Sequence, residues 1–283
     1  MTLLTSKNVK VKFGTGFPTA IIGERINPTN KKDLANELRE GRFDLLIKEA
    51  IKQKEAGADI LDINVGADGV NEEDILPEAV KLVSEVTGLP ICIDSSNSKA
   101  IEKALKIYPY KALINSTTGE DSKLEIILPM AKKYNAAVIC LAYDEDGISN
   151  DPITRIKVAE KIIEKAKYYK LPIEDIVIDC VALSSGVDSN FANVTLETIK
   201  KVSNELCVST VLGISNISFG MPMRDDLNLS FLSMAIANGL SAAIVDPTKE
   251  GVVEKILAAD YLNGRDKYGK RFISHYRKIK GVR

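Results

Sequence analysis

The chain has 283 residues, and its 38 Lys and Arg nearly balance 39 Asp and Glu, for a net charge of -1. This balance argues against a nucleic-acid-binding protein, because such proteins present a basic excess to the phosphate backbone. With 45% apolar residues, no apolar run of membrane-spanning length and no signal-peptide pattern at the N-terminus, the sequence indicates a cytoplasmic protein with a large core.

Short apolar runs rich in β-branched residues recur along the chain and predict eight strands. Their almost continuous apolar character is typical of strands that are covered on both faces. In chain order, the predicted strands are Thr19–Glu24, Ala58–Asn64, Pro90–Asp94, Ala112–Asn115, Ala136–Leu141, Ile176–Asp179, Val208–Ile214 and Ala242–Val245.

An amphipathic stretch follows each predicted strand. The first covers Asp44–Ala56, where the apolar residues form one stripe and Gly57 provides a C-terminal stop. The other predicted helices are Glu72–Val86, Lys99–Lys106, Ser122–Tyr134, Ile153–Tyr169, Leu196–Leu206, Leu229–Asn238 and Val252–Leu262.

Eight strand–helix pairs in this length predict an α/β fold of the closed (β/α)8 type, a TIM barrel. A doubly wound open sheet is the alternative, but it usually carries G-x-G-x-x-G directly after a strand, and the chain has no such motif. We expect a single domain over residues 1–283, with the barrel at about 19–262. Residues 1–18 would cap the bottom of the barrel, and residues 263–283 would form a basic C-terminal tail.

Histidine and cysteine usage narrows the chemistry. The sole histidine, His275, lies in the basic tail, and the chain has no CxxC motif, which argues against a zinc site and against a Ser-His-Asp or Cys-His device. Three of the four cysteines lie inside apolar runs, which predicts reduced core thiols in a reducing compartment. Any chemistry therefore depends on carboxylates, amides, hydroxyls, lysines or a cofactor.

Polar side chains end nearly all of the predicted strands, where a barrel of this type binds its ligands. These residues are Glu24 with Asn27, Asp62 with Asn64, Asp94, Asn115, Asp179, Ser215 with Asn216, and Asp246. Helix capping explains one such residue readily. It does not explain seven strand ends, because an unpaired buried polar group costs about 1–3 kcal/mol.

A flat heterocycle with both donors and acceptors, such as a pterin, would supply the missing partners. Carboxylates accept hydrogen bonds from its amino and ring N–H groups, and amides can donate as well as accept. A phosphate ligand would instead need a glycine-rich loop or a Lys/Arg cluster, which these strand ends lack. A metal held by Asp62, Asp94, Asp179 and Asp246 remains an alternative, because carboxylates are hard ligands.

Six motifs at these strand ends occur in a characteristic order. They are GERINPT (Gly23–Thr29), LDINVG (Leu61–Gly66), IDSSN (Ile93–Asn97), INSTTG (Ile114–Gly119), IVID (Ile176–Asp179) and LGISNISFGMPMR (Leu212–Arg224). Together they resemble the pterin-binding methyltransferases, in particular methyltetrahydrofolate:corrinoid protein methyltransferase and the folate module of cobalamin-dependent methionine synthase. The resemblance covers about residues 19–262; each motif alone is weakly specific, but six in order are highly specific.

The resemblance implies that Asp94, Asn115 and Asp179 hydrogen-bond the pterin ring. Asp62 and Asn64 would support the ring from the second strand. It also implies a TIM barrel and a homodimer.

Residues of the seventh strand and its loop take the remaining implied roles. Gly213 would let the ring approach the backbone, and Ser215 and Asn216 would lie beside the reacting edge. Asn216, with Asp94, is the implied catalytic residue, since its amide turns towards the N5 nitrogen. Arg224, in the loop after this strand, would contact the aminobenzoyl-glutamate tail, while Glu24 and Asn27 would lie at the rim or behind it.

The implied reaction moves a methyl group between N5 of methyltetrahydrofolate and the Co(I) of a corrinoid, with tetrahydrofolate as the other folate species. A tertiary amine leaves poorly unless a hydrogen bond or proton relieves its developing charge. The chain lacks the D-x-H-x-x-G motif that ligates cobalt, so the cobalamin would arrive on a partner corrinoid protein and no metal would be bound by this chain.

Three alternatives remain open. Dihydropteroate synthase shares the barrel and similar ring contacts, but it usually carries a serine-arginine-proline-glycine loop after the second strand and a lysine-x-arginine element late in the barrel; here the corresponding loops read NVGADGVNEED and SNISFGMPMRDD. A non-catalytic folate-binding protein would bind the vitamin without transfer. An oxygen-ligated, metal-dependent aldolase-type barrel would lose its activity on chelation.

Overall fold

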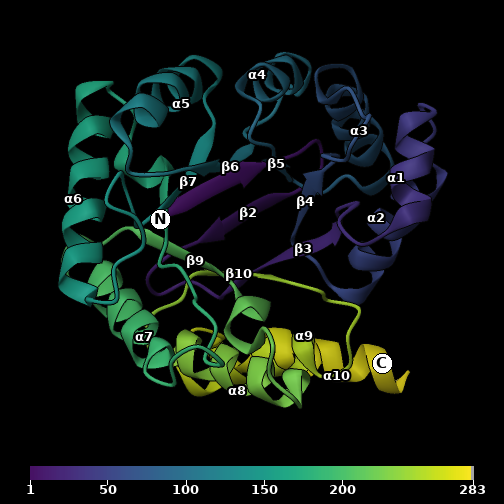
Figure 1. The fold of residues 1–283 in the computed structure, drawn as a ribbon. Helices are drawn as coiled ribbons and strands as arrows, with labels where there is room; N and C mark the ends of the chain where they lie inside the picture. The colour runs from purple at the N-terminus through teal and green to yellow at the C-terminus, as the bar shows by residue number, and fades with distance from the viewer. Residues whose placement is uncertain (282–283) are drawn as a thin grey trace.

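A computed structural model describes residues 1–281. Its central strands are β3 (Ala20–Ile26), β4 (Ile60–Asn64), β5 (Ile91–Asp94), β6 (Leu113–Thr117), β7 (Ala137–Leu141), β8 (Ile176–Asp179), β9 (Ser209–Gly213) and β10 (Ala242–Val245). They form a closed parallel barrel in the order β10-β3-β4-β5-β6-β7-β8-β9, with helices around it (Figure 1). The predicted (β/α)8 fold is confirmed.

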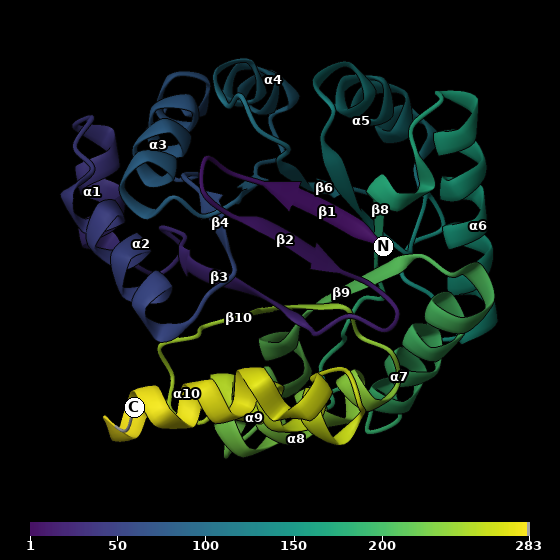
Figure 2. The same ribbon diagram turned by 180° about the vertical axis from the view of Figure 1, so that it is seen from behind.

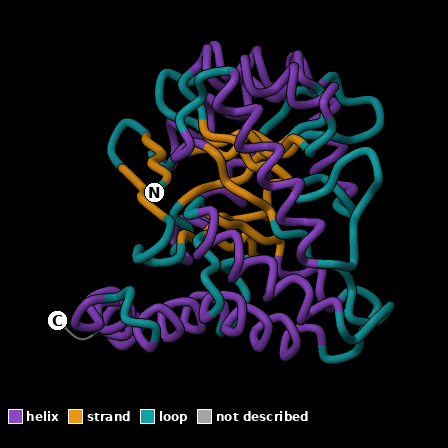
Figure 3. The backbone as a smooth tube through the Cα atoms, turned by 90° about the vertical axis from the view of Figure 1, so that its left-hand side faces the viewer, coloured by secondary structure: helices purple, strands orange, loops and turns teal. Residues whose placement is uncertain are grey.

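The helices surround the barrel on its outer face (Figure 3). They are α1 (Lys32–Arg39), α2 (Asp44–Ala56), α3 (Glu72–Thr87), α4 (Ser98–Ile107), α5 (Asp121–Tyr134), α6 (Pro152–Tyr168), α7 (Phe191–Lys201), α8 (Arg224–Ala237), α9 (Val252–Leu262) and α10 (Lys270–Lys280). Within residues 1–281, none of them is both long and apolar enough to cross a membrane.

Most predicted elements agree with the structure to within two residues, and β8, β10, α2 and α9 match exactly. The predicted helix starts at Leu196 and Leu229 are wrong, because α7 begins at Phe191 and α8 at Arg224. The first turn of α8 is polar and carries no apolar stripe. The two strands of the N-terminal hairpin and helix α1 were not predicted.

The barrel interior is filled by alternate residues of each strand, because side chains of a strand point to opposite faces. One closed apolar layer contains Ala20, Ile22, Ile60, Cys92, Leu113, Ala137, Ile139, Val177, Val211 and Ala242. A second, larger cluster fills the space between the strands and the surrounding helices. Interior positions further along each strand therefore lie above the apolar layer, at the C-terminal end of the barrel.

An antiparallel hairpin of β1 (Thr2–Thr5) and β2 (Lys10–Phe13) crosses the opposite, amino-terminal end (Figure 2). Its Leu4 and Phe13 are fully buried against the apolar interior layer. The Thr2 hydroxyl bonds Glu174 O, in the short 3-10 helix before β8, at 2.7 Å and the hydroxyl of Ser209, the first residue of β9, at 2.8 Å. With this end blocked, the C-terminal end is the open one.

Candidate functional site

A cavity of about 600 Å³ occupies the C-terminal end of the barrel. Ten of the eleven residues predicted for the site line it: Glu24, Asn27, Asp62, Asp94, Asn115, Asp179, Gly213, Ser215, Asn216 and Arg224. The eleventh, Asn64, lies behind Asp94 and donates a hydrogen bond to its carboxylate. The fold therefore brings together residues from six strands.

The pleat explains why these polar groups converge. Asp62 and Asp94 stand two positions after the interior residues Ile60 and Cys92, so they point to the same side of the sheet. Parallel pairing aligns Asp94 with Asn115 on the next strand. Their side chains consequently form a polar layer directly above the apolar one.

Two amides orient the carboxylates on the wall formed by β4, β5 and β6. Asn64 donates to Asp94 Oδ2 at 2.9 Å, while its own oxygen accepts the Gly66 N–H at 2.8 Å. Asn115 donates to Asp62 Oδ1 at 3.1 Å. One oxygen of each carboxylate is thus fixed before any ligand binds.

The two carboxylates influence each other. Burial raises the pKa of Asp62, and the nearby charge of Asp94 raises it further. Burial also raises the pKa of Asp94, whereas the hydrogen bond from Asn64 opposes that shift. A pair with raised pKa values can share a proton, and so can donate as well as accept hydrogen bonds to a ligand.

Asp179 forms a separate acceptor at the end of β8. Its Oδ1 accepts the Val181 N–H at 2.8 Å. Burial raises the pKa of Asp179 to about 6, and this hydrogen bond and the charge of Arg155 oppose the shift. Above that pH the carboxylate is ionised and can accept bonds from N–H groups in the cavity.

Ser215 and Asn216, which are predicted to lie beside the reacting edge of the ligand, belong to the 3-10 turn η3 (Ile214–Ser218), which follows β9. Asn216 is exposed there, and its side chain makes no hydrogen bond with the described part of the chain. A Cβ placed on Gly213 would lie 3.3 Å from Asn216 Nδ2, so a side chain at 213 would restrict this amide. The amide is therefore able to reorient towards a ligand.

Arg224 is the first residue of α8, whereas the sequence analysis placed it in a loop. Its Nε donates to Ser218 Oγ at 3.1 Å and its Nη2 to Ser215 O at 3.0 Å. These bonds tie α8 to the turn that carries Asn216. The exposed guanidinium keeps further donors directed to the cavity rim.

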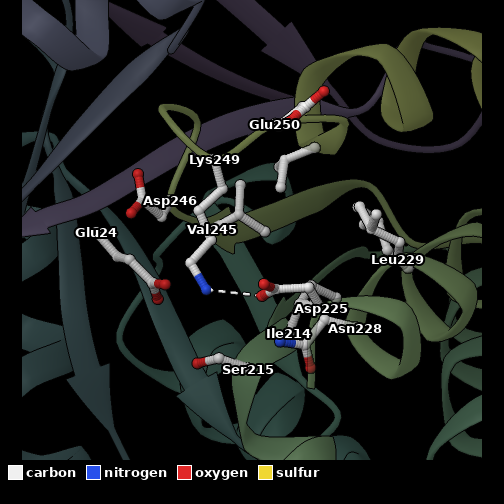
Figure 4. A pocket seen from close by; sticks show the side chains of 12 residues that line it. Glu24, Ile214, Ser215, Asp225, Asn228, Leu229, Val245, Asp246, Lys249 and Glu250 are labelled. Carbon is white, nitrogen blue, oxygen red and sulfur yellow. Dashed lines mark hydrogen bonds and ion pairs between the residues drawn. The ribbon is translucent and has the colours of Figure 1, made fainter. Parts of the chain in front are cut away.

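A smaller cavity of about 170 Å³ opens beside the central one, between η3, α8 and the end of β10 (Figure 4). Its wall includes Glu24, Asp246 and Lys249, which also line the central cavity. Burial raises the pKa of Glu24 to about 7, and the neighbouring Asp246 contributes to the shift. Lys249 Nζ lies 2.8 Å from the carboxylate of Asp225 and joins the β10 loop to α8.

Several lining residues were not assigned to the site from sequence. Asp246 ends the eighth strand and belongs to the strand-end pattern, but the family resemblance gave it no role in the pterin site. Lys31 immediately precedes helix α1, which was not predicted; Asn228 lies in α8, and Lys249 lies in the loop after β10. No local sequence pattern marks these three residues. Among residues 1–281, no group of three or more His, Cys, Asp and Glu is arranged to hold a metal ion.

Comparison with known proteins gives a consistent family match. The sequence model of the family described as "Pterin binding enzyme" matches residues 23–246. A curated relative, "Methylcorrinoid:tetrahydrofolate methyltransferase" from Eubacterium limosum, is 29% identical over 269 residues, which cover 92% of this chain and 97% of the relative.

Solved structures share the fold at low sequence identity. The Yersinia pestis dihydropteroate synthase has a TM-score of 0.68 at 17% identity, over 93% of this chain and 99% of its own. A second structure, Yersinia pestis DHPS with a pterine-sulfa conjugate, has a TM-score of 0.70 at 16% identity, over 93% of this chain and 99% of that one. At these identities the likeness concerns the barrel alone.

Proposed function

Since this chain belongs to the pterin-binding enzymes, we propose that it transfers a methyl group between N5 of methyltetrahydrofolate and the cobalt of a corrinoid carried by a partner protein. The observation that carries the proposal is the layer of carboxylates and amides at the open end of the barrel. The full-length similarity to a methylcorrinoid:tetrahydrofolate methyltransferase supports the choice of reaction.

The cavity suits a pterin ring held from two sides. Asp179 would accept from N–H donors at one edge, and the β5–β6 wall with Asp94 and Asn115 would bind the other. Asp62 and Asn64 would keep that wall oriented through the hydrogen bonds they already make. The tail of the folate would leave past Arg224 at the rim, beside Glu24 and Asn27.

In the direction away from folate, the N5–CH3 bond breaks, the methyl group joins Co(I), and N5 gains a proton. In the reverse direction a methylated cobalt gives up its methyl group and N5 loses the proton. Asn216 can strengthen a hydrogen bond to N5 in the transition state but cannot supply a proton. Glu24, which titrates near neutral pH in the adjoining wall, and Asp94 are the acids available to exchange it.

The partner would approach the open end of the barrel. Phe219 and Met223, on the segment between η3 and α8, and Val187, after β8, are 71%, 73% and 81% exposed. The two segments are joined by a 2.6 Å hydrogen bond from the Ser184 hydroxyl to Phe219 O. An apolar rim of this kind would fit a large, flat macrocycle and the protein that carries it.

The decisive experiment mixes the purified protein with cob(I)alamin and methyltetrahydrofolate, and separately with methylcobalamin and tetrahydrofolate. Transfer changes the visible absorption of the corrinoid in both directions. Folate binding without any spectral change, whichever corrinoid protein is offered, would indicate a non-catalytic folate-binding protein. Condensation of para-aminobenzoate with a pterin pyrophosphate would instead identify a dihydropteroate synthase.

Two further properties accompany this function. We expect a homodimer, which sedimentation would test, and a single-domain protein in the cytoplasm, which limited proteolysis and cell fractionation would test.

A further inference from the structure

The turn that follows β8 has an unusual backbone. Val181 has a φ of 56°, in the left-handed region that β-branched residues rarely adopt. In this conformation its N–H points back to Asp179 and donates to Oδ1 at 2.8 Å. The orientation of the Asp179 carboxylate thus depends on a costly backbone conformation two residues away.

A buried arginine outside the cavity makes the shortest contacts with this turn. Arg155, in the first turn of α6, is fully buried, and its Nη1 donates to Cys180 O and to Val181 O, both at 2.7 Å. Its Nε donates to Ser149 O at 2.7 Å and so fixes the guanidinium plane. Thr195 adds a weaker 3.1 Å bond to the same Val181 carbonyl.

Core packing alone does not call for an arginine here. Among residues 1–281, Arg155 Nη2 has no hydrogen-bond partner. A buried donor without a partner costs about 1–3 kcal/mol, and apolar residues usually replace buried charges without loss of stability. The buried guanidinium of Arg155 therefore has a cost in stability. Its contacts with the turn after β8 and its closeness to Asp179 explain why an arginine occupies this position.

We propose that Arg155 is a positioning residue for the pterin site: it holds the turn after β8 that orients Asp179 and places a positive charge near that carboxylate, without touching the ligand. This inference rests on the proposed function, because Asp179 matters only if it binds a ring N–H donor. The Arg155 side chain acts on Asp179 through its hydrogen bond to the Val181 carbonyl and through the electrostatic effect of its charge.

The other titratable groups around Asp179 cannot replace this charge. Tyr143, on the β7–α6 segment, and Cys180 have pKa values raised by burial and are neutral at physiological pH. Asp62 and Asp94, across the cavity, carry negative charge or share a proton. Arg155 is the one cation that lowers the pKa of Asp179 within the described chain.

The test measures methyltetrahydrofolate affinity by calorimetry between pH 5 and pH 8 for the wild type, Arg155→Met, Arg155→Lys and the exposed control Lys157→Met. Arg155→Met should weaken binding about tenfold at pH 5 and no more than about twofold at pH 7, because a raised pKa of Asp179 lowers its ionised fraction mainly at acidic pH; the acid limb should move to higher pH. Lys157→Met removes a charge from the same helix and should leave both values unchanged.

Two further sets of variants distinguish a positioning role of Arg155 from general damage to the fold. In Asp179→Asn, the further change Arg155→Met should cost less than about twofold, because the coupled partner is gone. Arg155→Lys keeps the charge but loses the paired donors, and adding Val181→Gly should restore most of its affinity, since glycine adopts the left-handed conformation without strain.

Wild-type affinity and pH profile in Arg155→Met, or a full tenfold loss that persists in Asp179→Asn, would overturn the inference. If Arg155→Met does not fold, failure of Val181→Gly to restore Arg155→Lys would overturn it equally. Absence of methyltetrahydrofolate binding by the wild type would refute the proposed function itself, before any variant is compared.

Discussion

Asp62 and Asp94 occupy interior positions of a barrel whose next layer down is entirely apolar. Asn64 and Asn115 each donate one hydrogen bond to these carboxylates. The pKa values of Asp62 and Asp94 are nevertheless raised, because burial disfavours their charged forms. Buried carboxylates with incomplete hydrogen bonding lower the stability of the fold, and a ligand that hydrogen-bonds to them offsets this loss. At the scale of single residues, the site is therefore a set of incompletely satisfied groups held in place.

Asn216→Ala should reduce methyl transfer far more than folate binding. The amide makes no hydrogen bond within the described residues, so its removal leaves the fold intact, and its bond to N5 would strengthen mainly in the transition state. We expect a loss of about 100-fold in turnover and less than about threefold in affinity, as for other groups of this type. Stopped-flow absorbance and calorimetry give the two values.

Asn204→Ala is the matched control, because Asn204 is exposed near the beginning of β9, at the opposite end of the barrel. Equal losses of binding and turnover in Asn216→Ala, or no loss in either, would contradict the role.

Glu24→Gln should stabilise the protein at alkaline pH. The pKa of Glu24 is raised from 4.5 to about 7, so its favourable contribution is complete below pH 4.5 and is lost as pH rises through 7. At pH 8 the charged wild type bears a cost of at most about 3 kcal/mol, which the neutral amide avoids. Urea unfolding at pH 8 and pH 5 measures the difference, which should shrink at pH 5.

The exposed Glu55→Gln serves as the control for general charge effects on the free energy of unfolding. A Glu24→Gln protein that is less stable than the wild type at pH 8, or equally altered at both pH values, would contradict the raised pKa of this carboxyl.

At the scale of elements, the segments after β8 and β9 support different residues of the site. The turn after β9 carries Asn216 and is tied to α8 through Arg224. Strand β8 ends at Asp179 and is followed by the turn that supports this residue, and Ser185 joins that segment to η3 through two 2.9 Å bonds to Ile217 O. The sides of the cavity that carry Asp179 and Asn216 are thereby mechanically connected.

The apolar rim makes a prediction about the partner. Replacing Phe219 and Met223 together with serine should lower transfer from a methylated corrinoid protein about tenfold or more, because interface apolar anchors commonly contribute about 1–2 kcal/mol each. Transfer from free methylcobalamin and folate affinity should remain unchanged, since neither side chain lines the central cavity.

Leu262→Ser is a control of similar exposure, 84%, at the C-terminus of α9 and hence near the other end of the barrel. A parallel fall with both methyl donors would place the rim residues in catalysis instead of docking.

At the scale of the whole molecule, the two ends of the barrel have separate tasks. The hairpin blocks the amino-terminal end with Leu4 and Phe13, while the C-terminal end holds the polar layer. Arg271 forms ion pairs with Asp59, just before β4, at 3.3 Å and with Asp260, near the end of α9, at 3.4 Å. Substitutions at the closed end should therefore change stability and leave the site unaltered.

Phe13→Ala should lower the free energy of unfolding by about 3–5 kcal/mol, the usual cost of truncating a fully buried phenylalanine. Denaturant unfolding measures the loss, and calorimetry below the transition should give a wild-type folate affinity. Lys12→Ala, exposed on the same strand, should change stability by less than about 0.5 kcal/mol. A large fall in folate affinity in Phe13→Ala would show that the two ends are coupled.

Much of this architecture follows from local patterns. Apolar runs and helical stripes identified all eight barrel strands, and the polar residues at their ends marked most of the predicted cavity residues, whereas Gly213 and Arg224 were assigned only through the family resemblance. These signals are local because pleat and helix periods repeat within a few residues. The hairpin was missed because its strand Lys10–Phe13 alternates charged and apolar residues over only four positions, too few for a reliable period.

The sequence by itself determined the barrel, the polar layer and the kind of ligand that matches it. Only the tertiary structure decided which side chains pair, because strand register and helix packing bring together residues far apart in the chain. Asn115 meets Asp62 across 53 positions, and Arg155 meets the Val181 carbonyl across 26. In the sequence Arg155 resembles any solvated residue of an amphipathic helix; its burial, and with it the control of Asp179, arises where α6 packs against the end of β8.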